Sequence, residues 1–446
     1  MKTPIAIGVV IGMLYTLSPL TVVSLVVVVA AAVAASKGLT SVERRWYWSV
    51  VAVAVLLRVI VVAVLFLTAD PSRPFASFFG DEELYKFRTV WVRNLGLGIS
   101  ISPADTIYSY DSVGRTSHLY VLAFIQALVG DAPYGLHMLS MMLYVCGVLA
   151  LYRFVRGAYG TGSMAGLIML LLLPSLAAWS VSILKEPMNA FALICELMCA
   201  VTLVRARDWR HKALAAAGVV VFALAMESLR AGGILTAAFG TLGGMILALI
   251  VARGRRVVAA LVIAPIAIAA LLSTSAAQDR ILANLRSFAA YHAGHVITPG
   301  HSYQLVNAGY YVDRIHLLNM MPPADAGRFA MKAVGSYFAE PLPWRADSRA
   351  LLAYWPEQVV WYLMTLLLPF GVLAGLRRDA VLTSMLVTHA VAAILLVALT
   401  SGNIGTLIRH RALALPYLVW LSALGAQECL RLFITARRVD QERVRG

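Results

Sequence analysis

The residues best suited to chemistry in this sequence are three consecutive carboxylates in the segment Gly80-Asp81-Glu82-Glu83-Leu84-Tyr85. Charged residues are scarce elsewhere, at 13% of the chain against 61% hydrophobic residues. The carboxylates follow a long apolar stretch, where the chain is expected to leave the membrane. A carboxylate at this boundary can take a proton from an attacking hydroxyl while the leaving group stays in lipid. Asp81 is the first candidate for such a base, and Glu82 is the second.

Residues 81–93 have the spacing of an amphipathic helix that lies along the membrane surface. Tyr85 and Arg88 share a face with Asp81 and could support substrate binding. Apolar side chains recur at spacings of three and four on another stripe: Leu84, Phe87 and Trp91. A purely structural explanation also exists, in which Asp81 caps the helix and the two glutamates favour the positive end of its dipole.

A second candidate motif is the turn Ser182-Ile183-Leu184-Lys185-Glu186-Pro187 between two apolar stretches. Lys185 could bind a phosphate and Glu186 a basic group. The structural alternative is that Lys185 reaches from a helix end to the membrane surface. In that case Glu186 stabilises the dipole of a helix whose first turn contains Pro187.

A third motif is the basic run Arg409-His410-Arg411, with Pro416 at the next apolar stretch. The donor groups of a guanidinium match the oxygens of a phosphate, although lipid headgroup anchoring is an alternative. Glu227 and Arg230 form a further candidate pair, of a kind that is more often structural. The nine histidines show no metal-ligand spacing, so no metal site is predicted.

Repeated apolar stretches of about 17–25 residues predict an all-α polytopic membrane protein with about eleven or twelve transmembrane helices. The first stretch is either one long helix or a hairpin broken near Pro19. The predicted spans are 4–36, 46–69, 117–130, 134–152, 162–181, 188–204, 213–229, 233–252, 257–274, 357–375, 380–400 and 412–430. Arg58 lies inside the second span and is expected to face the bundle interior or a cavity, because a charge in lipid is costly.

The net charge of +15 comes from basic clusters between the spans, such as Lys37/Arg44/Arg45 and Arg253/Arg255/Arg256. This distribution is typical of cytoplasmic loops and argues against nucleic-acid binding. It places the acidic segment, the Lys185 turn and the Arg409–Arg411 run on the outer side. The four cysteines lie within or beside apolar segments and predict no disulfide framework.

The same pattern divides the chain into five regions. These are N-terminal spans (1–69), an outer loop with the amphipathic helix and the acidic segment (70–116), a central transmembrane bundle (117–274), an outer segment (275–355), and a C-terminal bundle with a cytoplasmic tail (356–446).

Together these motifs resemble the GT-C superfamily of integral membrane glycosyltransferases, and more narrowly bacterial relatives of the protein mannosyltransferase and aminoarabinose transferase group. Asp81 takes the position of the family's acidic base, and the Lys185-Glu186 turn resembles a Lys-Asp/Glu element. Glu340-Pro341-Leu342-Pro343-Trp344 resembles a Pro-x-Pro-Trp element, and Arg409-x-Arg411 resembles a late basic motif. Two features depart from the family pattern: the extra apolar stretch 4–36 and the short outer segment 275–355.

The resemblance implies interfacial helices in the first outer loop and transfer of a sugar from a polyprenyl-phosphate donor to a glycan, lipid or protein acceptor. Asp81 or Glu82 would be the catalytic base, while Lys185, Arg409 and Arg411 would bind the donor phosphate. The reaction would invert the anomeric centre on the outer face of the bacterial cytoplasmic (inner) membrane. No cofactor is required, and a divalent cation is compatible but not implied. The alternatives are a polysaccharide polymerase or ligase acting on lipid-linked glycans, a lipid or solute transporter, and a non-catalytic scaffold of an envelope-assembly complex.

Overall fold

The computed structural model describes residues 18–68, 80–109, 117–130, 133–160, 163–252, 273–297, 301–311, 315–345 and 349–445. These residues form α-helices and short 3-10 helices, and no β-strand occurs among them. Nine helices of this described part are long and apolar enough to cross a membrane, and a bent pair adds a tenth if it counts as one span. The prediction of an all-α polytopic membrane protein is therefore confirmed. Residues 4–17 and most of the predicted span 257–274 lie outside the described residues.

The chain divides into two compact units, Met1–Ala237 and Ala238–Gly446. The helices of the first unit are α2 (Pro19–Ser36), α3 (Ser41–Leu67), α4 (Gly80–Gly96), α5 (Pro103–Tyr108), α6 (Ser117–Val129), α7 (Pro133–Tyr159), α8 (Ser163–Leu172), α9 (Pro174–Ser180), α10 (Glu186–Arg205) and α11 (Trp209–Leu229). Helix α12 (Gly233–Ala252) begins in this unit and continues into the next.

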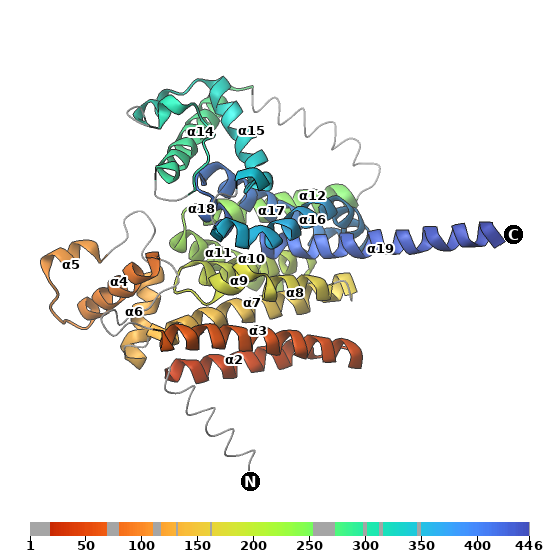
Figure 1. The fold of residues 1–446 in the computed structure, drawn as a ribbon, viewed down its shortest axis with the longest axis horizontal. Helices are drawn as coiled ribbons and strands as arrows, with labels where there is room; N and C mark the ends of the chain where they lie inside the picture. Colours follow the sequence, from red (N-terminus) through yellow and green to blue (C-terminus); the bar gives the residue numbers. More distant parts are fainter. Residues whose placement is uncertain are drawn as a thin grey trace, which may run out of the picture. The chain divides into compact units, whose positions relative to one another are not determined.

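Helices α7 and α10 form the centre of the first unit. Helix α2 packs along α7, α7 packs on α10, and α10 packs on α11, while α3 contacts α7 and α8 (Figure 1). The side chains of Leu136, Met141 and Val145 on α7 are fully buried. The outer helices α2 and α3 instead expose many aliphatic side chains, as expected where a helix faces lipid.

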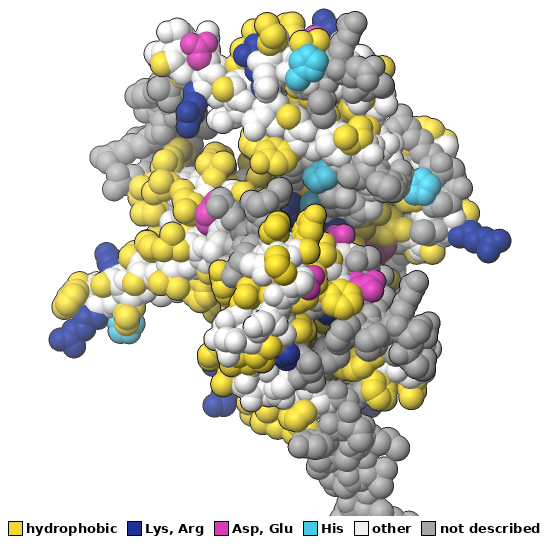
Figure 2. Space-filling model, turned by 90° about the vertical axis from the view of Figure 1, so that its left-hand side faces the viewer, with side chains coloured by type: hydrophobic (Ala, Val, Ile, Leu, Met, Phe, Trp, Pro, Cys, Tyr) yellow, Lys and Arg dark blue, Asp and Glu magenta, His cyan; other side chains and the backbone are white. Residues whose placement is uncertain are grey.

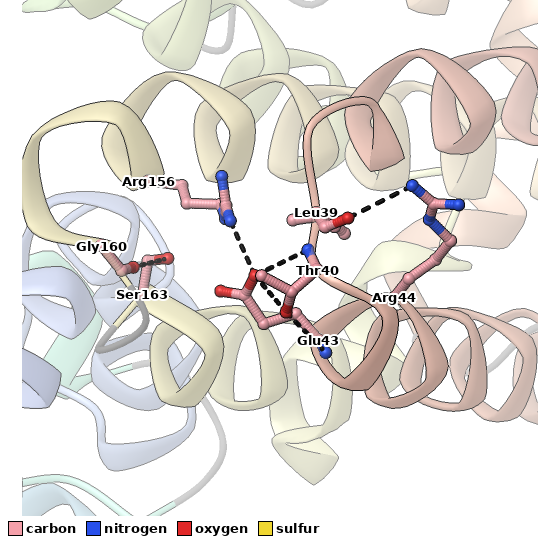
Figure 3. Close-up of polar contacts among 7 residues, drawn as sticks. All are labelled: Leu39, Thr40, Glu43, Arg44, Arg156, Gly160 and Ser163. Carbon is pink, nitrogen blue, oxygen red and sulfur yellow. Dashed lines mark hydrogen bonds and ion pairs between the residues drawn. The ribbon is translucent and has the colours of Figure 1, made fainter.

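The beginning of α3 is fixed by polar contacts at the turn that follows α2. Thr40 and Glu43 form a capping box, in which the Thr40 side chain accepts from the Glu43 N–H and the Glu43 carboxylate accepts from the Thr40 N–H. Arg156 of α7 donates to Glu43 Oε2 at 2.7 Å (Figure 3). The helix therefore starts at Ser41, five residues before the predicted start at Trp46.

The predicted span 162–181 is broken into α8 and α9, whose axes differ by 60°. Pro174 has no N–H and disfavours helical geometry at Leu173, which has φ −56° and ψ 126°. Arg58 of α3 lies at this break with 1% of its surface exposed. Its guanidinium donates to Leu171 O (2.9 Å) and to Ser180 Oγ (2.7 Å). The predicted inward orientation of Arg58 is thus confirmed, and the single uninterrupted span is corrected.

The predicted span 117–130 corresponds to α6, which has only 13 residues. About 20 residues are needed to cross the hydrocarbon core as a helix. Helix α6 is therefore shorter than a complete span. It packs against α4 and brings His118 into the interior of the unit.

The second unit contains two groups of helices. Those of the outer segment are α14 (Ser275–Val296), η2 (Ala308–Tyr310), η3 (Ile315–Met320), α15 (Pro323–Ala339) and η4 (Pro343–Arg345). The remaining helices are α16 (Arg349–Arg378), α17 (Ala380–Thr400), α18 (Ile404–Arg411) and α19 (Leu415–Arg445).

Helices α16 and α19 pack together at unusually close range. A Cβ atom added at Gly371 would lie 1.7 Å from Leu421 O, and one added at Gly425 would lie 2.2 Å from Leu367 O. The absence of side chains at these two positions lets the two backbones touch, which is a common device between membrane helices. Figure 1 shows α16, α17 and α19 running together.

Candidate functional site

The acidic segment meets the Lys185-Glu186 turn inside the first unit. Glu82 of α4 is fully buried, and its Oε1 accepts a hydrogen bond from the Ile183 N–H at 2.9 Å. These two residues are separated by 101 positions in the sequence. Two of the three predicted motifs therefore contribute to one place in the fold.

The turn between α9 and α10 is a non-helical segment in the interior of the unit. Its residues Val181, Ile183 and Leu184 are at most 1% exposed. His118 Nε2 donates to Ile183 O at 2.8 Å, and His137 Nδ1 donates to Val181 O at 2.6 Å. A carbonyl only accepts, so these bonds place a proton on each of those ring nitrogens. Irregular backbone among membrane helices is stable only when its polar groups find such partners.

Charged groups surround this turn. Lys86 of α4 is 1% exposed, and its burial lowers the pKa of the ammonium group to about 8, although the carboxylates of Glu82 and Glu83 oppose that shift. The charges of Lys185 and Glu186 lie close enough to act on the His118 ring. The turn is therefore lined by both acidic and basic side chains, several of them buried.

Helix α4 has the predicted helical form but turns its polar face inward. Glu82, Lys86 and Thr89 are buried, whereas Leu84 and Phe87 are 46% and 39% exposed. Such an exposed apolar stripe suits contact with lipid. On the face of the molecule that carries α4 and α5, acidic side chains lie among exposed hydrophobic ones (Figure 2). The buried polar face of α4 anchors the helix on the turn.

The other predicted residues of this helix differ in their surroundings. Asp81 is exposed, next to the buried Glu82. Tyr85 packs edge-on against the His118 ring, with the ring centroids 5.7 Å apart. Arg88 is half-buried, and its Nε has no hydrogen-bond partner among the described residues. Asp81 is therefore the more exposed of these two neighbouring carboxylates.

Lys185 and Glu186 lie where the sequence suggested, at the start of α10. Pro187 is in the first turn of this helix, as predicted. Lys185 is half-buried, whereas Glu186 is 4% exposed. The partial exposure of Lys185 keeps this cation accessible from the surface of the unit.

Glu227 has a structural explanation. Its Oε2 accepts from the Gly232 N–H at 3.0 Å and from the Ile234 N–H at 3.2 Å. It thereby satisfies donors at the beginning of α12. Arg230 is the residue that ends α11. These contacts favour a role in the α11–α12 connection over the support of a substrate.

Arg411 is an internal anchor of the second unit. It is 2% exposed and donates to Gln358 Oε1 (2.9 Å), to Tyr337 O (2.6 Å) and to Glu340 O. Its guanidinium carbon also lies 4.5 Å from the centre of the Trp361 ring. The basic motif and the Glu340–Trp344 motif are thus brought together. The proposed phosphate role of Arg411 would compete with these contacts.

Arg409 is half-buried on α18, which the outer segment holds in place. His292 Nδ1 donates to Ser401 O at 2.7 Å, and the Tyr303 N–H donates to Gly402 O at 3.0 Å. The Ile404 N–H donates to His301 O at 2.8 Å. Asp81 belongs to the first unit and Arg409 to the second, so the site predicted to contain both stays a prediction.

Lys86, His118 and His137 were not predicted from the sequence as members of the site. Each of the two histidines stands within an apolar stretch, where a polar side chain is costly unless it is bonded. A single histidine within an apolar stretch was therefore the sequence signal that could have identified them. Their partners could not be found from sequence, because the carbonyl groups of a turn carry no side-chain signature.

Among the described residues, no group of three or more His, Cys, Asp or Glu side chains is arranged to hold a metal ion. Comparison of the chain with protein-family models, with curated proteins and with solved structures gives no match. The helices and the buried turn are therefore the basis for any assignment of function.

Proposed function

We propose that this protein is a GT-C-type membrane glycosyltransferase that moves a sugar from a polyprenyl-phosphate donor to a glycan, lipid or protein acceptor. The observation that carries the proposal is the hydrogen bond between Glu82 and the Ile183 N–H. It joins a short acidic helix to a buried turn that ends in a half-buried lysine. A proton acceptor and a cation for a leaving phosphate are the two groups that this transfer needs.

Asp81 is the proposed catalytic base. It takes the proton of the acceptor hydroxyl as that oxygen bonds to the anomeric carbon of the sugar. The bond between this carbon and the phosphate oxygen breaks, and the phosphate leaves with the electron pair. A single displacement from the opposite side inverts the anomeric configuration. The exposure of Asp81 supports its contact with an acceptor from outside the bundle.

Lys185 is the proposed cation that stabilises charge on the departing phosphate. Glu82 is a positioning residue, because its carboxylate holds α4 on the turn that carries Lys185. Tyr85, Arg88 and Glu186 are candidates for further substrate contacts. Arg409 is the candidate from the second unit, while Arg411 is better explained as a structural residue.

The first test is an in vitro transfer assay on purified Asp81→Asn protein in nanodiscs. Asparagine keeps the size and capping ability of aspartate but cannot accept the proton at neutral pH, so we expect transfer to fall by about a hundred- to ten-thousand-fold. Binding of the donor should change little. Transfer by the variant at the wild-type rate would exclude Asp81 as the base.

Two matched variants separate the role of Glu82 from that of Asp81. Glu82→Gln keeps an oxygen that can accept from the Ile183 N–H, so we expect it to retain more activity and a higher melting temperature than Glu82→Ala, although it removes a charge that acts on the buried Lys86. Glu82→Ala removes that acceptor as well and should lower both the activity and the melting temperature further. Equal loss of transfer in the Gln and Ala variants, with both folded, would instead indicate that Glu82 itself is the base.

A fourth variant tests the donor site, and analysis of the product tests the class of reaction. Lys185→Ala should weaken donor binding as well as turnover, because Lys185 contacts phosphate in the ground state. Mass analysis of the product distinguishes a transferase, which adds one sugar, from a polymerase or ligase, which adds a whole glycan.

A further inference from the structure

An apolar cavity lies between α2 and α3 in the first unit. Its volume is about 360 Å³, within the range of small-ligand pockets. It is lined only by hydrophobic side chains, including Leu25, Val28 and Ala32 of α2 and Trp48, Ala52 and Val59 of α3. Both helices are long and apolar enough to cross a membrane, so the cavity opens toward hydrocarbon.

The cavity arises because α2 and α3 pack mainly against other helices and little against each other. Helix α2 packs along α7, whereas α3 packs on α7 and α8. Val28 and Ala32 form the floor of the cavity and are 1% exposed, while Val29 and Leu56 are 55% and 59% exposed at its rim. The cavity is therefore a groove with an open side and a buried base.

The length of the groove matches one leaflet of a bilayer. The lining residues extend from Leu25 to Ala32 on α2, about 10 Å, and from Trp48 to Val59 on α3, about 16 Å, at 1.5 Å per residue. Half of the hydrocarbon core is about 15 Å thick. An acyl chain of one phospholipid fills this length.

The end of the groove near Ala32 and Trp48 adjoins a positively charged turn. Lys37, Arg44 and Arg45 are exposed there. The nearby acidic group, Glu43, is bound by Arg156 at 2.7 Å and by Thr40, so its charge is compensated (Figure 3). Each basic residue near the membrane surface attracts anionic lipid by about 1 kcal/mol. Trp46, 63% exposed, lies at the same level, where aromatic residues contact headgroups.

We propose that this groove binds one anionic phospholipid, with an acyl chain between α2 and α3 and its headgroup at Lys37 and Arg45. The lipid belongs to the leaflet on the side of the basic turn. The acidic helix α4 follows the opposite end of α3, so this site is separate from the proposed donor site. It is independent of the proposed function.

The test is native mass spectrometry of the detergent-purified protein, titrated with phosphatidylglycerol or with phosphatidylcholine carrying the same acyl chains. The wild-type protein should retain phosphatidylglycerol at least tenfold more tightly than phosphatidylcholine. Ala52→Phe fills the groove and should weaken the binding of both lipids about tenfold. The matched control Val53→Phe adds the same ring on a 55% exposed, lipid-facing position outside the groove and should bind as wild type does.

Removing the charges of the turn distinguishes the contribution of the lipid headgroup to binding from that of the acyl chain. The double variant Lys37→Ala and Arg45→Ala should lose the preference for phosphatidylglycerol while still binding phosphatidylcholine. Equal binding of both lipids by the wild-type protein, or unchanged binding by Ala52→Phe, would overturn the proposal. So would a wild-type dimer that Ala52→Phe converts into a monomer, because a second copy would then occupy the groove.

Discussion

At the scale of single residues, buried polar side chains in this protein act mainly by binding backbone groups. The turn before α10 has its backbone N–H and C=O groups bonded by Glu82, His118 and His137. At the break between α8 and α9, Arg58 donates to the Leu171 carbonyl group. Arg411 does the same for the carbonyl groups of Tyr337 and Glu340. The buried charged side chains of Glu82, Arg58 and Arg411 therefore bind backbone groups at places where the helical hydrogen-bond pattern is interrupted.

His292 gives a pH-dependent prediction at this scale. It is fully buried, and its burial lowers the pKa of the ring to about 4. The unfolded chain binds a proton near pH 6.5, so it holds more protons than the folded protein between pH 6.5 and 4. The stability of the second unit should therefore be complete above pH 6.5 and fall on acidification through pH 4, by roughly 3 kcal/mol from this residue.

Hydrogen exchange of α14 and residues 301–311 at pH 7 and pH 4.5 measures this effect. His292→Gln keeps an amide donor for Ser401 O and removes the titrating group. The variant should exchange more slowly than wild type at pH 4.5 relative to pH 7. An unchanged pH dependence in the variant would show that other groups cause the loss.

At the scale of helices, the second unit contains a close crossing of α16 and α19 that depends on glycine at Gly371 and Gly425. Gly371→Ala places a methyl group 1.7 Å from Leu421 O, so the two helices must separate. Excess volume in a packed interior typically costs about 1–3 kcal/mol. We expect a lowered melting temperature for the purified variant in detergent.

Gly335→Ala on α15 is the matched control. A Cβ atom at that position meets nothing within 4 Å, and alanine in a helix is favoured over glycine by about 0.5–1 kcal/mol. The control should melt at or slightly above the wild-type temperature. Similar melting of Gly371→Ala and wild type would contradict the close crossing.

The helices could be predicted from sequence where hydropathy and length determine them. The spans 188–204, 213–229, 233–252 and 380–400 agree closely with α10, α11, α12 and α17. Prediction was wrong where a local polar contact or a proline decided the outcome. The Thr40–Glu43 capping box moved the start of α3, and Pro174 divided a hydrophobic stretch that hydropathy alone reads as continuous.

For the candidate site, the sequence predicted the charged motifs but not how their side chains are oriented. The acidic segment and the Lys185 turn were recognised because charged residues are rare in this composition. The orientation of α4 was not evident, since Asp81 and Glu82 are adjacent carboxylates and the sequence does not show which of them points into the interior. The Glu82 side chain points inward because it accepts a hydrogen bond from the Ile183 N–H, and no sequence pattern reveals this contact.

At the scale of the whole molecule, the charged turns and the helix lengths predict on which side of the membrane each turn lies. The turn containing Lys37 precedes α3, and the exposed Ser100 follows α4. Helix α3 has the length and hydropathy of a full span, whereas α4 is polar on one face and is not one of the nine candidates. The two positions should therefore lie on opposite sides of the membrane.

Cysteine labelling in intact cells tests this topology. In a background with the four native cysteines replaced by alanine, Ser100→Cys should react with a membrane-impermeant maleimide added outside. Lys37→Cys should react only after the membrane is opened, because basic turns remain in the cytoplasm. Labelling of both positions from the same side would exclude α3 as a single crossing.

The contact between Glu82 and Ile183 also has a consequence for the order of events during synthesis. Ile183 is made 101 residues after Glu82, which at about 5–20 residues per second is a delay of about 5–20 s. During that interval the polar face of α4 has no turn to pack against, and its apolar stripe can only rest on the membrane. The Glu82–Ile183 hydrogen bond can therefore form only after the turn before α10 has been made, which happens before half of the chain has been translated.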